Sequence, residues 1–319
     1  MNAGNESIQM VSGGVCAAKG FKAAGVYCGI RKNPNKKDLA LIVSETKANA
    51  AAVYTTNLVK GAPLTVTKTH ISDGKAQAVI CNSGNANTCN ADGIEIAETM
   101  SKITADALGI AAGDVVVASA GVIGQPLSVK PIAAAIPKLV DELSPEGSGE
   151  ACSAIMTTDT KKKEIAVEFM LGGKTCRLGG IAKGSGMIHP NMATMLVFLT
   201  TDAAISAGML QKALSGDIQT TFNMISVDGD TSTNDMVTIL ANGLAGNEVY
   251  LPEFGLPFLP GTFIQTPVIE KKALGIRGLV VGILPHDYGL EALYGSIGTC
   301  QAAKPRHNHQ YYPNLFHNF

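Results

Sequence analysis

Short apolar runs separated by polar turns recur along the first two thirds of the chain and predict buried β-strands. The clearest runs are residues 39–43, 78–81, 114–118 and 195–199, each bounded by charged residues or by turn-forming residues. A further segment, 165–182, alternates weakly and is interrupted by Gly172-Gly173, which predicts two strands joined in a hairpin.

Other segments carry apolar residues at helical spacing. One runs from Ile96 to Ala107, with Gly109 as a stop, and a second covers residues 207–222. We expect a third helix at 235–241, because a polar turn precedes it and an Asn-Gly pair follows. This order of strands and helices is compatible with an α/β fold.

Composition excludes several classes of protein. The 319 residues are 46% hydrophobic and 16% charged, which is typical of a globular chain with one large or two moderate domains. A net charge of −1 gives no attraction for nucleic acid or an anionic membrane, so we expect neither as a partner. The seven scattered cysteines favour buried free thiols, and residues 1–19 lack the pattern of a secretory signal, so we expect a cytoplasmic protein.

Residues 183–202 form the most distinctive stretch. A Gly-Ser-Gly corner at 184–186 permits close backbone approach, and His189-Pro190-Asn191 is a turn signal. Ala193 and Thr194 follow, directly before the apolar run at 195–199. The pattern thus predicts a threonine at the junction of a tight loop and a buried strand.

This threonine has two interpretations. Cleavage of the chain before Thr194 would free an α-amine that can act as the base for the Thr194 hydroxyl. The unperturbed pKa of such an amine, roughly 7.7–8.0, lets it take and return a proton near neutral pH. Alternatively, Thr194 merely caps or packs at the start of a strand, and the pattern alone favours this second interpretation.

Several other residues could bind a substrate or stabilise a reaction intermediate, although each also has a purely structural interpretation. Gly121 ends a strand and can present a backbone N–H to an oxyanion. Lys183 can pair with a substrate carboxylate or lie on the surface, and the threonines of segment 156–160 can bind a carboxylate or acetyl group. The polar segment 82–87 is a loop near the site or an ordinary turn, and the lysine run 161–163 is most simply a solvated loop.

Six segments, in order, resemble the self-cleaving ornithine acetyltransferase family, also called bifunctional glutamate N-acetyltransferase. They are KGFKAAGVYCGI at 19–30, KKDLALIVSE at 36–45, NSGNANTC at 82–89, MTTDT at 156–160, KGSGMIHPNMATMLVFLTTD at 183–202 and FNMISVDGDTSTND at 222–235. The resemblance covers about residues 1–247. Six matches in the same order are far more specific evidence than a single glycine-rich motif.

The resemblance implies a fold and a division of the chain. The fold would be a layered α/β sandwich of β-sheets and helices of the ornithine acetyltransferase and β-aminopeptidase type, rather than a doubly wound Rossmann sheet. Cleavage between Ala193 and Thr194 would give an α fragment, 1–193, with the oxyanion and substrate loops, and a β fragment, 194–319, beginning with the nucleophile. Two copies of each fragment assemble in that family.

The resemblance also implies an enzyme and a ping-pong reaction. Thr194 would take the acetyl group of N2-acetylornithine and pass it to glutamate, giving ornithine and N-acetylglutamate for arginine biosynthesis. Gly121 would stabilise the oxyanion, Thr157 and Lys183 would orient the substrate, and no metal or organic cofactor would take part. Acetyl-CoA, which some relatives accept, stays open as a further donor.

Two departures from the family pattern bear on activity. The threonine that would supply a second oxyanion donor is Ala120 here, and loss of one such donor costs on the order of 10²–10³ in rate. Residues 247–319 do not match the family and hold half of the 14 prolines. We interpret this atypical, poorly folded tail as a frameshifted, truncated or mis-spliced translation.

These departures leave two alternatives to the acetyltransferase. An amidohydrolase or aminopeptidase of related fold would pass the acyl group to water instead of glutamate. An inactive or structural family member would not cleave itself at all.

Overall fold

The computed structural model describes residues 8–187, 195–219, 221–224 and 230–249. All of these belong to the first of two compact units, Met1–Leu284, whereas the second, Pro285–Phe319, lies outside the described residues. The interpretation of the tail falls almost wholly outside them and stays a hypothesis.

The described chain contains both strands and helices. The strands are β1 (Gln9–Val11), β2 (Phe21–Val26), β3 (Leu39–Tyr54), β4 (Lys75–Asn85), β5 (Val115–Val122), β6 (Lys163–Leu171), β7 (Lys174–Lys183), β8 (Leu196–Thr201) and β9 (Met236–Ala241). The α-helices are α1 (Ala62–His70), α2 (Gly93–Leu108), α3 (Lys130–Asp141), α4 (Ser148–Ile155) and α5 (Ala207–Ile218).

One long strand, β3, joins two halves of the sheet. The strand order is β1-β6-β7-β8-β9-β3-β4-β5, and β2 also pairs with β3. The first part of β3 pairs with β2 and β4, whereas its last six residues pair with β9. The register between β3 and β4 shifts between Val43 and Ala48. Such irregularities bend a strand, which allows the sheet to fold into two layers.

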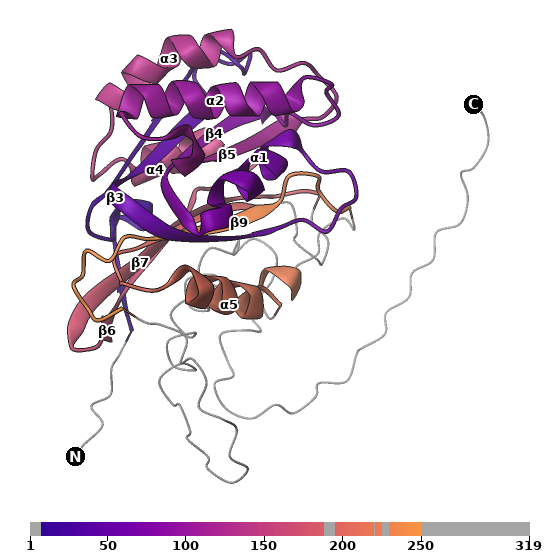
Figure 1. Cartoon of the computed structure of the whole chain (residues 1–319). Helices are drawn as coiled ribbons and strands as arrows, with labels where there is room; N and C mark the ends of the chain where they lie inside the picture. Colours follow the sequence, from indigo (N-terminus) through magenta and orange to yellow (C-terminus); the bar gives the residue numbers. More distant parts are fainter. Residues whose placement is uncertain (1–7, 188–194, 220, 225–229, 250–319) are drawn as a thin grey trace, which may run out of the picture. The chain divides into compact units, whose positions relative to one another are not determined.

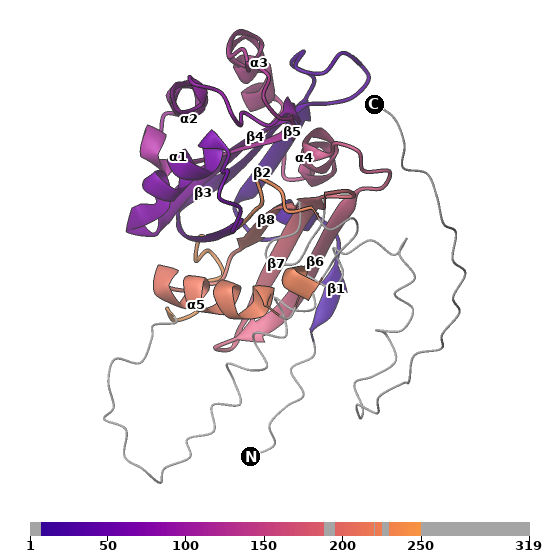
Figure 2. The same cartoon turned by 90° about the vertical axis from the view of Figure 1, so that its right-hand side faces the viewer.

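Helices cover both outer faces of the two layers (Figures 1 and 2). The helices α1, α2 and α3 lie over the layer that holds β4 and β5, and α5 lies over the layer that holds β8 and β9. The short helix α4 contributes to the apolar core between the layers. The layered α/β sandwich expected from the sequence is therefore the observed fold.

Alternation along the central strands explains the separate cores. Successive side chains of a strand point to opposite faces. In β8, Leu196 and Phe198 lie in the core between the layers, whereas Val197 and Leu199 lie in the core beneath α5. The same alternation in β5 directs Ala120 into the core between the layers.

Several sequence predictions are confirmed. The hairpin is present as β6 and β7, and α2 ends where Gly109 adopts a left-handed conformation. Helix α5 begins after Ser206, whose hydroxyl accepts the Met209 N–H, but it ends at Ile218 rather than at 222. Ala107, which was expected on the buried face of α2, is exposed.

The prediction of a helix at 235–241 is wrong, because residues 236–241 form strand β9. Its six residues, MVTILA, are all buried. They pair in parallel with β8 and antiparallel with β3. Branched apolar residues in a strand flanked on both sides by neighbours outweigh the local cap-like signals at its two ends.

The cysteines only partly follow the prediction. None of the six that the structure describes forms a disulfide, and Cys81, Cys152 and Cys176 are buried. Cys89, however, is exposed, and Cys300 lies outside the described residues.

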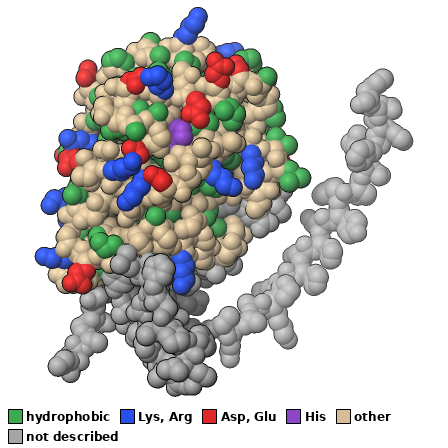
Figure 3. All heavy atoms as spheres, in the orientation of Figure 1, with side chains coloured by type: hydrophobic (Ala, Val, Ile, Leu, Met, Phe, Trp, Pro, Cys, Tyr) green, Lys and Arg blue, Asp and Glu red, His purple; other side chains and the backbone are tan. Residues whose placement is uncertain are grey.

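Acidic and basic side chains are intermingled on the face of the molecule in Figure 3, in keeping with a net charge of −1. Among the described residues, no helix is both long enough and apolar enough to cross a membrane.

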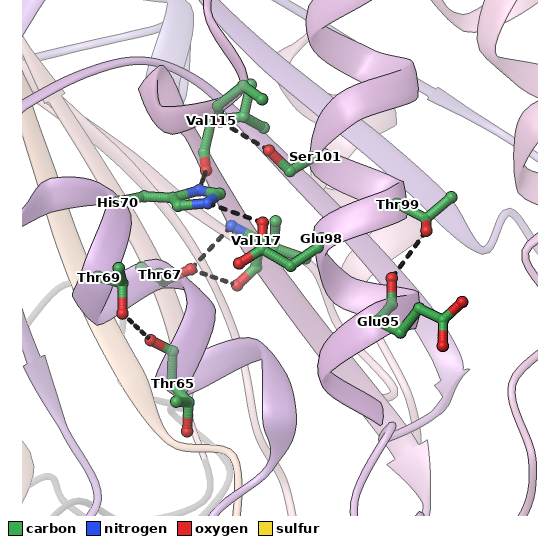
Figure 4. Close-up of polar contacts among 11 residues, drawn as sticks. Thr65, Thr67, Thr69, His70, Glu95, Glu98, Thr99, Ser101, Val115 and Val117 are labelled. Carbon is green, nitrogen blue, oxygen red and sulfur yellow. Dashed lines mark hydrogen bonds and ion pairs between the residues drawn. The ribbon is translucent and has the colours of Figure 1, made fainter. Parts of the chain in front are cut away.

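Helix α1 protects the edge of the sheet at β5 (Figure 4). The Thr67 hydroxyl donates to Val117 O and accepts from Val117 N, both at 2.8 Å. One turn later, His70 Nδ1 lies 2.9 Å from Val115 O, and its Nε2 lies 3.2 Å from Glu98 Oε2 on α2. Thus two side chains of a helix replace the next strand as partners for β5.

Replacing Thr67 by valine should lower the free energy of unfolding by about 1–3 kcal/mol, because the Val117 N–H and C=O would stay buried without a partner. Thr69→Val is the matched control, since the exposed Thr69 hydroxyl bonds only Thr65 O of its own helix. Its effect should stay within about 0.5 kcal/mol. Urea unfolding of both variants measures the difference, and equal losses would show that α1 does not protect this edge.

Candidate functional site

A pocket of about 700 Å³ lies where the ends of β4, β5 and β7 meet the starts of β8 and β9. It is lined by Ile30, Arg31, Lys32, Asn33, Gly84, Ala86, Ala120, Gly121, Val122, Ile123, Gln125, Thr157, Thr158, Lys183, Gly186, Met187, Leu196, Ser232, Thr233, Asn234 and Asp235. Segments distant in sequence therefore converge on one cavity of the size that binds small molecules.

The residues predicted from the sequence fall into two groups. Ala120, Gly121, Thr157 and Lys183 all line this pocket. Ala193 and Thr194 lie outside the described residues, so the predicted cleavage site stays a prediction. The chain is described again from Met195, and the next residue along, Leu196, is part of the pocket wall.

Gly121 occupies a position that only glycine fits. Its φ is +134°, and a Cβ there would lie 2.3 Å from the carbonyl carbon of Gly84. The parallel strands β4 and β5 can come this close at their ends because both residues lack side chains. The neighbouring Ala120 offers a methyl group where the family resemblance led us to look for a hydroxyl.

Lys183 is buried at the end of β7, with only 5% of its surface exposed. Burial lowers the pKa of its ammonium, and the carboxylates of Asp159 and Asp235 oppose that lowering. The simpler interpretation from the sequence, a surface lysine, is therefore wrong for this residue. A buried cation in a pocket wall is suited to binding a carboxylate.

A buried ion pair that sequence reasoning missed holds the segments around Lys183. Lys163 Nζ lies 2.5 Å from Asp159 Oδ1, with side chains 8% and 0% exposed, so the expectation of a solvated lysine run fails at Lys163. Asp159 also accepts the N–H groups of Gly184 and Thr157, at 2.8 and 3.1 Å. Lys163 in turn donates to Gly184 O at 2.8 Å. The pair thus fixes the backbone at Thr157 and directly after Lys183, the two predicted substrate residues.

The electrostatics of Asp159 follow from these contacts. Burial acts to raise the pKa of its carboxyl, but the hydrogen bonds from Lys163 and from the Gly184 N–H outweigh burial, and the net pKa is lowered. Asp159 is therefore held as a carboxylate.

Asp235 closes the inner wall of the pocket and was also missed. It is 1% exposed, and its Oδ1 accepts the Met195 N–H at 2.9 Å. Burial raises the pKa of this carboxyl, an effect that the Lys183 ammonium, Ser232 and the Met195 N–H only partly offset. Lys183 and Asp235 thus line the pocket, and the Lys163–Asp159 pair is buried beside it. No three His, Cys, Asp or Glu side chains of the described chain cluster as metal ligands.

The polar segment 82–87 lies at the pocket, as one of the two expectations had it, but residues 82–85 continue a strand and are neither a loop nor a turn. It belongs partly to β4, and Asn82 Oδ1 accepts a buried hydrogen bond from the Ser119 hydroxyl at 2.6 Å. Gly84 and Ala86 from the same segment line the pocket. The asparagine ties the two strands together, while the small residues leave room for a ligand.

The fold and the pocket define a layered α/β protein with a pocket at the strand ends, lined by a buried lysine and by a glycine at the end of a strand. A model of the ArgJ family matches residues 22–256. The chain belongs to the ArgJ family, which confirms the resemblance drawn from its motifs.

Individual relatives agree with this assignment. An arginine biosynthesis bifunctional protein ArgJ from Symbiobacterium thermophilum is 52% identical over 247 residues, which are 77% of this chain and 61% of that protein. This chain therefore spans only about three fifths of the length of that relative.

Two solved structures share the fold. A crystal structure of arginine biosynthesis bifunctional protein argJ from Bacillus halodurans matches with a TM-score of 0.56 and 43% identity, over 59% of this chain and 100% of that one. The ornithine acetyltransferase of Mycobacterium tuberculosis, complexed with ornithine, matches with a TM-score of 0.53 and 33% identity, over 60% of this chain and 100% of that one.

Replacing Lys163 by methionine should lower the free energy of unfolding by about 3–5 kcal/mol, because it leaves the buried Asp159 carboxylate uncompensated. Lys102→Met is the matched control, since Lys102 and Asp106 form a pair of the same i,i+4 spacing with side chains 68% and 64% exposed. That surface pair should contribute about 0.3–0.5 kcal/mol.

The destabilisation expected for Lys163→Met depends on pH. Because the pKa of Asp159 is lowered in the folded protein, its stabilising contribution is present above the unfolded pKa of about 3.9 and is lost as the pH falls. In urea unfolding, the difference in free energy of unfolding between the parent protein and Lys163→Met should become smaller as the pH is lowered through about 4. A gap that stays constant would contradict this account.

Proposed function

We propose that this protein is an acyltransferase that moves the acetyl group of N2-acetylornithine to glutamate in arginine biosynthesis. The carrier is Thr194, freed as a chain N-terminus by cleavage of the Ala193–Thr194 bond. Membership of the ArgJ family supports the proposal, as does the likeness to an ornithine acetyltransferase whose structure holds ornithine.

One observation carries the proposal. Gly121, Thr157 and Lys183 line a single pocket, and its wall continues into Leu196, two residues after Thr194. Gly121 offers a backbone N–H at a strand end, Thr157 a hydroxyl and Lys183 a buried ammonium. An acylated amino acid presents a carbonyl and a carboxylate, which are the groups that such a set can bind.

In the first half-reaction, the Thr194 hydroxyl attacks the acetyl carbonyl carbon while the Thr194 α-amine takes the hydroxyl proton. The Gly121 N–H stabilises the oxyanion that forms. The amide C–N bond then breaks, and ornithine leaves with the proton returned by the α-ammonium. The acetyl group stays behind as an ester on Thr194.

In the second half-reaction, the glutamate amine attacks the ester carbonyl. The Thr194 oxygen leaves with a proton, and N-acetylglutamate is released. Lys183 and Thr157 orient both amino acids, and acetyl-CoA is a further candidate donor for the first step. Attack by water instead would release acetate.

The strand order is compatible with activity after cleavage. Strands β8 and β9, which follow Thr194, lie between β7 and β3, which precede it. Ladders on both sides would hold the fragments 1–193 and 194–319 together once the chain is cut. We propose that two copies of each fragment assemble.

Purified parent protein should contain two chains by intact mass, one ending at Ala193 and one beginning at Thr194, whereas Thr194→Ala should stay uncut. The cut protein should release ornithine from N2-acetylornithine. Because glutamate competes with water for the acyl-enzyme, added glutamate should divert the acetyl group from acetate to N-acetylglutamate. Mass spectrometry of protein and products measures both steps.

Two outcomes would contradict the proposal. Acetate formation that glutamate does not reduce would identify a hydrolase of related fold. An uncut chain that releases no ornithine would identify an inactive member of the family.

Replacing Ala120 by threonine should raise kcat by about 10²–10³, because it adds a hydroxyl donor beside Gly121. Ala120→Val is the matched control, since valine has the shape of threonine without its hydroxyl, and Ala120 is only 3% exposed. Steady-state kinetics of the three proteins separates the donor from the change in volume. An equal response to threonine and valine would exclude a role for the hydroxyl.

A further inference from the structure

The two walls of the pocket that the proposed reaction uses belong to different parts of the sheet. Gly121 lies near the end of β5, which pairs with β4, whereas Met195 leads into β8, which pairs with β7 and β9. In the strand order, β9, β3 and β4 separate β8 from β5. Contacts at the strand ends must therefore set the distance between the walls.

Asp235 holds the wall at Met195. Its carboxylate accepts the Met195 N–H at 2.9 Å, and the Met236 N–H binds Met195 O at 3.1 Å. The Asp235 carbonyl is itself bound by the Thr55 N–H at 2.9 Å. The residue that follows the proposed nucleophile is thus held on both sides.

Asn234, the preceding residue, holds the opposite wall. Its Nδ2 donates to Ala86 O at 2.6 Å and to Ser119 O at 3.0 Å. Its Oδ1 accepts from the hydroxyls of Thr88 and Thr233, both at 2.6 Å. A carboxamide has two N–H donors and an oxygen with two lone pairs, so the hydrogen-bonding capacity of Asn234 is filled.

The contacts of Asn234 converge on the Gly121 wall. Ser119 lies two residues before Gly121 in β5. Gly121 packs against Gly84, and Ala86 lies two residues after Gly84. Asn234 is 7% exposed, and a Cβ on Gly61 would lie 2.6 Å from its Oδ1. The carboxamide is thus enclosed and has little freedom to turn.

We propose that Asn234 and Asp235 are positioning residues that keep the Gly121 donor and the strand carrying the nucleophile at a fixed separation. This inference rests on the proposed function and assigns neither residue a contact with substrate. Two consecutive side chains reach both walls, so a shift of one wall is transmitted to the other. A misplacement of about 1 Å can reduce a rate by about 100-fold.

Asn234→Asp tests the Gly121 wall. The new carboxylate still accepts from Thr88 and Thr233, but it turns an oxygen instead of two N–H donors toward Ala86 O and Ser119 O. We expect kcat to fall by about 100-fold with little change in KM for N2-acetylornithine, because no group that binds the substrate is altered. Thr67→Val is the control, since it removes the contacts of α1 with Val117 of β5 without touching Asn234, Asp235 or the pocket lining, and it should leave kcat unchanged below its unfolding temperature.

Asp235→Ala and Asp235→Asn test the Met195 wall. Alanine removes the acceptor of the Met195 N–H, whereas asparagine keeps an amide oxygen at that place. We expect kcat to fall by about 100-fold in the alanine variant and to be largely restored in the asparagine variant. A merely structural role for Asp235 would instead change thermal stability without separating kcat from KM.

Hydrogen exchange followed by mass spectrometry makes the test independent of catalysis. Asp235→Ala should accelerate exchange in peptides from 195–201, and Asn234→Asp in peptides from 115–122, with 93–108 unchanged as an internal reference. Parent-like exchange and parent-like kcat in both variants would overturn the inference. A parent protein that releases no ornithine would overturn the proposed function alone, because the exchange results would still decide the positioning role.

Discussion

The parallel pairing of β8 with β9 is the interaction on which the site depends. Parallel strands begin at the same edge of a sheet, and the register here sets Leu196 opposite Met236. The residues just before each strand, Met195 and Asp235, are therefore neighbours. Because both strands are packed on both faces, the Asp235 carboxylate is withdrawn from water and needs polar partners within the protein.

The same burial explains why the charges of the pocket occur as a group. Asp159 is paired with Lys163, whereas Lys183 makes no ion pair of 4.0 Å or less within the described part of the chain. Asp159 and Asp235 still act on Lys183 at longer range and favour its charged form. Burial still leaves the pKa of Lys183 lowered, so a substrate carboxylate, the partner that we propose, would further stabilise its ammonium.

Local signals predicted the elements that depend on local interactions. The Gly172-Gly173 turn marks where β6 ends and β7 begins, and the left-handed Gly109 marks the end of α2. Both signals lie within a few residues of the structure that they determine. Strand β9 could not be predicted in this way, since its state is decided by β8 and β3, which lie far away in the chain. Likewise, Asp159 and Lys163 are each polar residues of a polar segment, and only their pairing makes both of them buried. For Gly121, Thr157 and Lys183, motif resemblance chose the functional role over the structural alternative, because periodicity carries no information on which strand ends meet.

The two oxyanion donors expected in this family differ in how they can be lost. A hydroxyl donor is absent wherever the side chain lacks it, as at Ala120, whereas a backbone N–H is present in every residue except proline. Its placement at Gly121 is enforced by the close approach to Gly84, which excludes every residue with a Cβ. The position of this donor is therefore a property of the β4–β5 pairing rather than of one side chain. A chain that has lost the hydroxyl would run the proposed acyl transfer more slowly, with the reaction class unchanged, because preorganised backbone donors act without reorganisation when the charge develops.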